Sequence, residues 1–307
     1  MVDFGKRYTY EEMMEGIYGL KERWPQLLTV EEAGISHDDR CIPGIWLGEG
    51  RECLICSAGI HGRESVNPIL LLRMIEDYCE NWEKEPLLAR YGLYLLPILN
   101  PDGYEVALKG FQALRSPILR HAMRMRNQPH ETWKCNGRGV DINRNFPCSS
   151  YRPGNGSWYP ASENETKALM DVFQKFPDSV GYIDFHSRGR IIYYYRNAMT
   201  EDYNQKSARF AKTLQEFSNY DLGTWRDESK TKADGGNSVH YYSERYARPA
   251  LTVETVEDEA GFPLDASYQR QTYEEIRRLP LAYLEEYDKT EKKDASGRSC
   301  IFESRPV

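Results

Sequence analysis

Short apolar runs alternate along the chain with segments of helical periodicity, and this alternation limits the possible folds more than any other feature. The runs expected to form strands span residues 29–35, 42–48, 52–60, 91–99, 180–185, 190–195 and 250–256. The segments expected to form helices span residues 10–24, 64–80, 201–218, 238–246 and 268–287, with one more helix opening near residue 162. This order predicts an α/β fold with a largely parallel sheet and helices on both faces.

A chain of 307 residues is long enough for one large α/β domain. We expect that domain over residues 1–289 and a polar tail over residues 290–307. Periodicity weakens from about 108 to 160, and a stretch of this length without a pattern is usually functional or disordered. Ser162 and Glu165 then form a capping-box pattern that is expected to start the next helix.

Charge and hydropathy exclude several classes of protein. The net charge of −7 gives no general attraction to nucleic acid or to an anionic membrane surface. There is no apolar run long enough to span a bilayer, and the N-terminal residues lack the apolar core of a signal peptide. We therefore expect a cytoplasmic protein, unless a leader has been removed. The seven cysteines are an odd number without a disulfide pattern, and Cys53 and Cys56 are expected to be core thiols on opposite faces of one strand.

His61 and Glu64 lie three positions apart, where an expected strand ends and an expected helix begins. Both side chains can turn toward one metal ion, and imidazole nitrogen with carboxylate oxygen suits zinc. The pattern alone is common, so a solvated glutamate beside a histidine that caps the strand is the alternative interpretation. His186 closes another strand and is the natural third ligand, although a lone histidine there could also be a hydrogen-bonded core residue.

In parallel sheets, ligands bind beyond the carboxyl ends of the strands. His61, the turn that begins at Asn100, His186 and Glu254 all fall at or just after the ends of expected strands. This shared placement is a stronger indication of a site than any single motif.

Glu254 lies inside an apolar run, where a carboxylate is unfavourable unless it has a partner or a function. Burial would raise its pKa toward the range useful for a general base; the alternative is an exposed glutamate at a strand edge. Arg144 between two asparagines, one of them Asn143, suits a substrate carboxylate, although a surface arginine paired with an acid fits the same residues. Asp141 could accept the free N–H of a metal-bound histidine.

Five motifs occur in the order seen in zinc carboxypeptidases of the carboxypeptidase A type, which the chain resembles over about residues 8–285. They are His61–Glu64, Asn100–Tyr104, Gly139–Phe146, His186–Ser187 and Thr252–Glu254. The resemblance implies an α/β/α sandwich around a mixed, mostly parallel eight-stranded sheet. It also implies one Zn²⁺ held by His61, Glu64 and His186, with Glu254 as general base and acid. Asn143 and Arg144 would bind the terminal carboxylate of a peptide substrate.

Within that family, Trp133–Arg138 running into Gly139–Asp141, and Tyr159–Thr166 before a helix, are similar to a bacterial branch. That branch cleaves γ-D-glutamyl-diaminopimelate bonds in the peptides of murein, the peptidoglycan of the cell wall. For the second amino–carboxyl centre of diaminopimelate, position in the sequence suggests Arg188, Arg190, Asp234 and Asn237.

Two positions depart from the family pattern. Thr231 stands where the digestive enzymes have a tyrosine that closes over the substrate. The arginine that polarises the scissile carbonyl has no single match, and Arg138 is the first choice with Lys134 as the second.

Three other functions stay open from the sequence. The chain could be an ordinary C-terminal carboxypeptidase or an aspartoacylase-like amidohydrolase of N-acyl amino acids. It could also be a non-catalytic peptide-binding protein, which the intact set of His61, Glu64, His186 and Glu254 disfavours.

Overall fold

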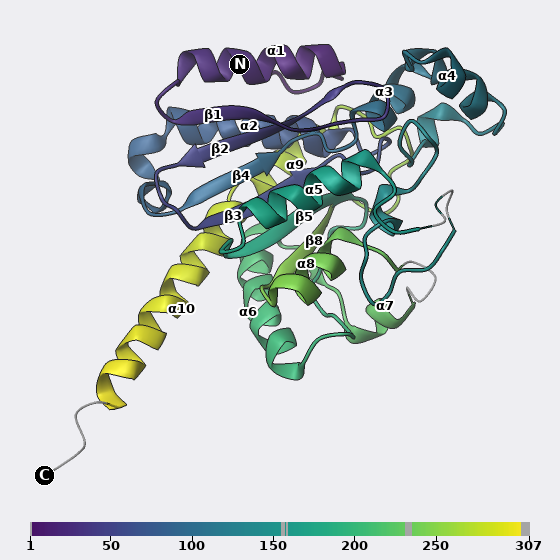
Figure 1. Ribbon diagram of the computed structural model, residues 1–307. Coiled ribbons are helices and arrows are strands. Elements are labelled where there is room, and N and C mark those ends of the chain that lie inside the picture. The colour runs from purple at the N-terminus through teal and green to yellow at the C-terminus, as the bar shows by residue number, and fades with distance from the viewer. Residues whose placement is uncertain (1, 155–156, 158, 231–234, 302–307) are drawn as a thin grey trace, which may run out of the picture.

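The strands form a single mixed sheet. A computed structural model of the protein describes residues 2–154, 157, 159–230 and 235–301. Within these residues the sheet has eight strands in the order β1-β2-β4-β3-β5-β8-β6-β7 (Figure 1). The strands are β1 Leu28–Ile35, β2 Cys41–Gly48, β3 Cys53–Ala58, β4 Gly92–Leu96, β5 Gly181–Ser187, β6 Ile191–Tyr193, β7 Asp221–Leu222 and β8 Ala250–Thr255.

The four central strands β4, β3, β5 and β8 are mutually parallel. Antiparallel pairing joins β1 to β2, β2 to β4 and β6 to β8, while the short β7 runs parallel to β6. The sheet is therefore mixed with a parallel centre, as expected from the sequence. The carboxyl ends of the four central strands meet at one edge of the sheet, which is where parallel sheets place their ligands.

Helices cover both faces of the sheet. The helices are α1 Tyr10–Arg23, α2 Val66–Glu80, α3 Pro101–Lys109, α4 Pro117–Arg124, α5 Asn164–Lys175, α6 Glu201–Ser218, α7 Trp225–Lys230, α8 Ser238–Tyr246, α9 Tyr268–Ile276 and α10 Leu279–Ile301. Short 3-10 segments lie at Trp82–Lys84, Pro86–Ala89, Phe111–Ala113, His130–Thr132 and Ile142–Arg144.

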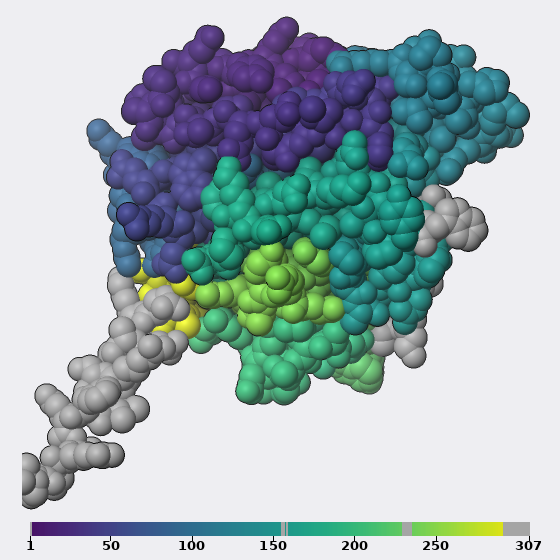
Figure 2. All heavy atoms as spheres, in the orientation of Figure 1, coloured from purple at the N-terminus to yellow at the C-terminus, as the bar shows by residue number. Residues whose placement is uncertain are grey.

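Side chains along the central strands point alternately to the two faces of the sheet, so the core has two parts. On β3, Leu54 and Cys56 pack with residues of α1, α2, α6, α9 and α10 on one face of the sheet. Cys53 and Ile55 pack with α5 and α8 on the other face. The teal α5 and the green α8 lie next to one another on the surface shown in Figure 2. Because residues two apart share a face, Asp184 and His186 on β5 and Glu254 on β8 belong to the α5 and α8 side.

Helices α6 and α8 span the residues expected from the sequence. The single helix expected over 268–287 is instead two helices, α9 and α10, with Pro280 in the first turn of α10. Proline has no N–H to continue the hydrogen bonding of α9, so the chain restarts there. Helix α10 runs to Ile301, so helical structure continues past the boundary expected at residue 289.

The capping box expected at Ser162 is wrong. Helix α5 begins at Asn164 after Glu163, and no side chain caps its first turn. Ser162 Oγ donates instead to the Glu163 carboxylate at 2.7 Å. Helices α3, α4 and α7 were not expected. The turn signal at Asn100 is in fact a helix start, in which the Asn100 side chain accepts from Gly103 N–H and Pro101 lies in the first turn.

Cys41, Cys53, Cys56, Cys79, Cys135 and Cys148 are free thiols, with Cys53 and Cys56 on opposite faces of β3 as expected. Among the described residues, we find no helix with the length and apolar character needed to cross a membrane.

Candidate active site

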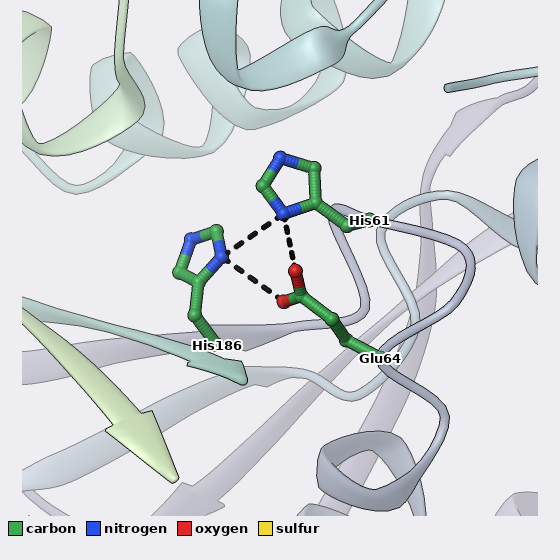
Figure 3. A group of neighbouring side chains, drawn as sticks. All are labelled: His61, Glu64 and His186. Carbon is green, nitrogen blue, oxygen red and sulfur yellow. Dashed lines mark hydrogen bonds and ion pairs between the residues drawn. The ribbon is translucent and has the colours of Figure 1, made fainter. Parts of the chain in front are cut away.

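His61, Glu64 and His186 meet at the carboxyl edge of the parallel strands (Figure 3). His61 follows β3, Glu64 precedes α2, and His186 lies near the end of β5. His61 Nδ1 is 2.7 Å from Glu64 Oε1, His186 Nδ1 is 3.1 Å from Glu64 Oε2, and the two Nδ1 atoms are 3.2 Å apart. All three side chains are buried. Burial opposes ionisation of Glu64, but the two histidines lower its pKa below the ordinary range.

The outer nitrogen of each histidine faces a carboxylate. Asp141 Oδ1 is 3.2 Å from His61 Nε2, and Asp184 Oδ2 is 3.0 Å from His186 Nε2. Such a carboxylate orients a metal-binding imidazole and fixes its tautomer, so that the other nitrogen faces the ion. Two Nδ1 atoms and one buried carboxylate are the nitrogen and oxygen donors of a catalytic zinc site. The donor set therefore fits one Zn²⁺.

Asp184 was not predicted as a site residue. The signal that identifies it is the period of two in a strand, which places residues 184 and 186 on one face.

Asn100 connects the loop that carries His61 to the loop that carries Lys134. Its Nδ2 donates to the carbonyl of Ile60 at 3.0 Å and to that of Cys135 at 3.2 Å. Gly62 lies so close to Gly103 that a Cβ on Gly62 would be 2.1 Å from the Gly103 carbonyl oxygen. The glycine in the His-Gly-Arg-Glu string is therefore required by close approach of two backbones.

Glu254 lies on β8 directly opposite His186 on β5. Its side chain lines a cavity of about 510 Å³ that also contains the three residues of the His–Glu–His group. Burial raises the pKa of Glu254 to about 8, with Glu64 adding to the rise and His186 opposing it. A carboxyl group with a raised pKa beside a metal site is suited to accept and return a proton near neutral pH.

Asn143 and Arg144 line the same cavity from the 3-10 segment Ile142–Arg144. Asn143 Oδ1 accepts from Ser238 N–H at 3.0 Å, and Arg144 Nη1 donates to the Asn143 carbonyl at 2.7 Å. Gly236 supports this segment, since Phe146 N–H donates to its carbonyl at 2.9 Å and its φ of +88° favours glycine. The pair expected to bind a carboxylate thus faces the cavity that contains Glu254.

Lys134 and Arg138, the two candidates for the group that polarises the carbonyl, differ in their position relative to the cavity. Lys134 lines the cavity, with Nζ 2.9 Å from Asp141 Oδ2, and its charge acts on Glu254. Arg138 is not among the residues that line the cavity, and its Nη1 lies 3.6 Å from Glu163 Oε1. The geometry therefore favours Lys134 over Arg138 as the group nearer to Glu254, and the role of either residue stays a prediction.

Of the residues proposed for a second amino–carboxyl centre, Arg188 and Asn237 line the cavity. Arg190 does not, since its guanidinium pairs with Glu275 on α9. Asp234 and Thr231 lie outside the described residues. Further charged or titratable residues that were not predicted as site residues also line the cavity, among them Arg196, Asp227, Glu228 and His240.

These features define a metalloprotein of the α/β class whose site is built for one zinc ion. The chain belongs to the zinc carboxypeptidase family, since the family model with that description matches residues 13–278.

Relatives and solved structures agree with this assignment. The chain is 24% identical over 210 residues to carboxypeptidase B of Astacus astacus, covering 63% of this chain and 65% of that one. It is 26% identical over 217 residues to γ-D-glutamyl-L-diamino acid endopeptidase 1 of Lysinibacillus sphaericus, covering 63% and 54%. Both matches span less than two thirds of the relative's length.

Among solved structures, bovine thrombin-activatable fibrinolysis inhibitor in complex with tick carboxypeptidase inhibitor superposes with a TM-score of 0.77 at 20% identity. That match covers 94% of this chain and 99% of the other. Carboxypeptidase A from Helicoverpa armigera gives 0.74 at 21% identity, covering 92% and 75%. At these identities the structures show a shared fold.

Proposed function

We propose that the protein is a zinc-dependent metallopeptidase that hydrolyses an amide bond next to a carboxylate-bearing residue. The observation that carries this proposal is the pairing of Glu254 with His186 on adjacent strands. This pairing puts the Glu254 carboxyl group, which has a raised pKa, beside His61, Glu64 and His186. The same cavity also contains Asn143 and Arg144.

Each residue has a distinct part in the proposed reaction. His61, Glu64 and His186 would hold the zinc ion, which would supply a Lewis acid and a water nucleophile near neutral pH. Glu254 accepts the proton of the attacking water at a carboxylate oxygen and returns it to the leaving nitrogen. Lys134 stabilises the developing oxyanion with its ammonium group. Arg144 and Asn143 bind the substrate carboxylate and so align the scissile bond.

For the substrate, we propose γ-D-glutamyl-diaminopimelate bonds of murein peptides. The polar cavity supports this choice, because charged residues line it in addition to the three zinc ligands. They include Arg188, Arg196, Asp227 and Glu228. A leaving residue that carries charged groups would meet complementary charges in this wall, and an apolar one would not. The similarity to an endopeptidase named for γ-D-glutamyl-L-diamino acid bonds supports it as well. A cytoplasmic location stays a prediction.

A direct comparison of substrates tests the proposal. We expect the zinc-loaded enzyme to release diaminopimelate from L-Ala-γ-D-Glu-diaminopimelate with a higher kcat/KM than it releases a C-terminal residue from α-linked peptides. Preference for the α-linked peptides would instead support an ordinary carboxypeptidase, the second candidate, since carboxypeptidases A and B are among the similar proteins. Preference for N-acyl amino acids would support the aspartoacylase-like alternative. Absence of turnover with zinc bound would support a peptide-binding protein.

A further inference from the structure

Arg196 and Glu228 bring a pair of opposite charges to the wall of the cavity. Arg196 follows β6 and Glu228 lies on α7, and both residues line the cavity that contains Glu254. Arg196 also borders a neighbouring cavity together with Glu228 and His240. We refer to Arg196 and Glu228 as the charged pair.

Arg196 is held rigidly at the start of β8. The residue is 2% exposed, Nη2 donates to the Ala250 carbonyl at 2.8 Å, and Nη1 donates to the Tyr195 carbonyl at 2.7 Å. Its backbone N–H donates to Asn204 Oδ1 at 2.8 Å, and Asn204 Nδ2 donates back to the Arg196 carbonyl at 3.1 Å. The guanidinium is therefore preorganised, so little entropy is lost when it binds a ligand.

The hydrogen bonding of this buried guanidinium is incomplete within the described residues. Its Nε is buried without a hydrogen-bond partner there. The distance from Nη1 to Glu228 Oε2 is 3.9 Å, longer than a hydrogen bond. A buried charge without full hydrogen bonding is unfavourable, so a ligand carboxylate beside Arg196 would be stabilising.

Glu228 is held in a similar way from the other side. Its Oε1 is 3.0 Å from His240 Nε2, and His240 Nδ1 is 2.8 Å from Ser150 Oγ. Burial opposes ionisation of Glu228, but His240 and Arg196 lower its pKa, so the side chain is a carboxylate at neutral pH. A carboxylate in this place suits a ligand ammonium.

The strand β8 sets the distance between the charged pair and the reacting groups. Arg196 binds the carbonyl of Ala250, and Glu254 lies four residues further along the same strand. At about 3.3 Å per residue the Cα atoms of Ala250 and Glu254 are roughly 13 Å apart. Thr252 and Tyr193 lie between, paired across β8 and β6, and both line the cavity. A leaving residue bound near Glu254 therefore approaches the charged pair with the far end of its side chain.

We propose that the charged pair is a specificity subsite for the amino–carboxyl end of a long side chain on the leaving residue, with Arg196 binding the carboxylate and Glu228 binding the ammonium. This inference rests on the proposed peptidase function. The two charges of such an end are carried by one carbon, and the charged pair presents complementary charges side by side. A lysine side chain would bring an ammonium to Glu228 but no carboxylate to Arg196, and a norleucine side chain would bring neither group.

Two series of substrates separate the subsite from the bond type. Each series carries meso-diaminopimelate, lysine or norleucine as the leaving residue; one series has a γ-D-glutamyl bond before it and the other an α-linked alanyl bond. In whichever series is cleaved, we expect kcat/KM to fall about 10- to 100-fold from diaminopimelate to lysine, and again from lysine to norleucine. Cleavage of the α-linked series alone would reject the proposed bond but not the subsite. Norleucine cleaved as well as diaminopimelate would overturn the subsite.

Substitutions assign the two roles. Arg196→Gln should lower the ratio of kcat/KM for diaminopimelate over lysine at least about tenfold, and Glu228→Gln should lower the ratio for lysine over norleucine. Arg124→Gln, on the exposed side of α4, is the matched control that retains both ratios. Thermal unfolding checks that each variant is folded.

If Arg196→Gln does not fold, inhibition of the wild-type enzyme by free meso-diaminopimelate, lysine and 2-aminopimelate replaces it. We expect diaminopimelate to inhibit most strongly. Equal inhibition by the three compounds, or unchanged ratios in folded variants, would overturn the proposal.

Discussion

Asp184 Oδ2 lies 3.0 Å from Nε2 of His186, two residues further along β5. Asp184 is itself held by two hydroxyl groups, since Ser57 Oγ donates to Oδ1 at 2.7 Å and Ser238 Oγ donates to Oδ2 at 2.6 Å. Burial opposes ionisation of Asp184, but His186 and these hydroxyl groups lower its pKa. The carboxylate therefore keeps the proton of His186 on Nε2 and leaves Nδ1 to face Glu64.

Replacing Asp184 with Asn should weaken zinc binding about 10- to 100-fold, because an amide neither orients the imidazole nor increases its basicity as a carboxylate does. Competition with a chelator of known affinity measures the change. Asp178→Asn, on the exposed surface after α5, serves as the control. An unchanged affinity in Asp184→Asn would show that Asp184 does not support the ligand.

Replacing Glu254 with Gln should leave the zinc content at one ion per chain and lower kcat by about 10²- to 10⁴-fold. The amide retains the shape of the side chain but cannot accept the proton of the attacking water. Metal analysis and steady-state kinetics on the same preparation check both parts. Full activity in this variant would refute the role of Glu254 as the base.

Replacing Lys134 with Ala should lower kcat/KM by about 10²- to 10³-fold, the usual effect of removing one group that stabilises an oxyanion. Arg138→Ala should change it less than about twofold, because Arg138 contacts Glu163 rather than the cavity. Kinetics of the two variants on one substrate decide between them, and a larger loss in Arg138→Ala would restore the first choice made from the sequence.

Stability should depend on pH through Glu165, which is fully buried on α5. Burial and the nearby Asp102 raise its pKa from 4.5 to about 7. The folded state therefore binds the proton of the Glu165 carboxyl group more tightly than the unfolded state does. The contribution of this proton to the free energy of unfolding is fully present below pH 4.5 and is lost as the pH rises through 7.

Gln at position 165 is neutral at every pH, so Glu165→Gln should be more stable than the wild type at pH 8, by on the order of 3 kcal/mol. The difference should shrink toward pH 4.5. Urea unfolding at the two pH values measures it. An identical pH profile in both proteins would show that Glu165 does not titrate in this range.

The sequence predicted the fold class and the meeting of His61, Glu64 and His186, because both depend on apolar strands that alternate with helices and on polar residues at the carboxyl ends of those strands. It did not distinguish Lys134 from Arg138, since residues 134–141 follow no regular period. Their path depends on contacts such as Asn136 Oδ1, which accepts from the backbone N–H of Arg138 and Val140 at 3.0 Å each.

Arg196 and Glu228 were missed for a different reason. Arg196 lies beyond the end of a three-residue strand, and Glu228 lies in a six-residue helix. Neither element is long enough to have a recognisable period. Tertiary contacts bring the two residues together. Arg196 binds the Ala250 carbonyl, and Glu228 pairs with His240.

The register of β5 and β8 places the residues proposed for the reaction apart from those proposed for the choice of substrate. His186 and Glu254 sit on neighbouring strands of a hydrogen-bonded sheet, so their spacing is that of the strands themselves, about 4.8 Å. Arg196 and Glu228 belong to peripheral connections that are not part of this pairing. Exchanging those connections for others should change the substrate specificity and leave His186 and Glu254 in place. The segment between β6 and α8 is therefore the natural place to redesign specificity.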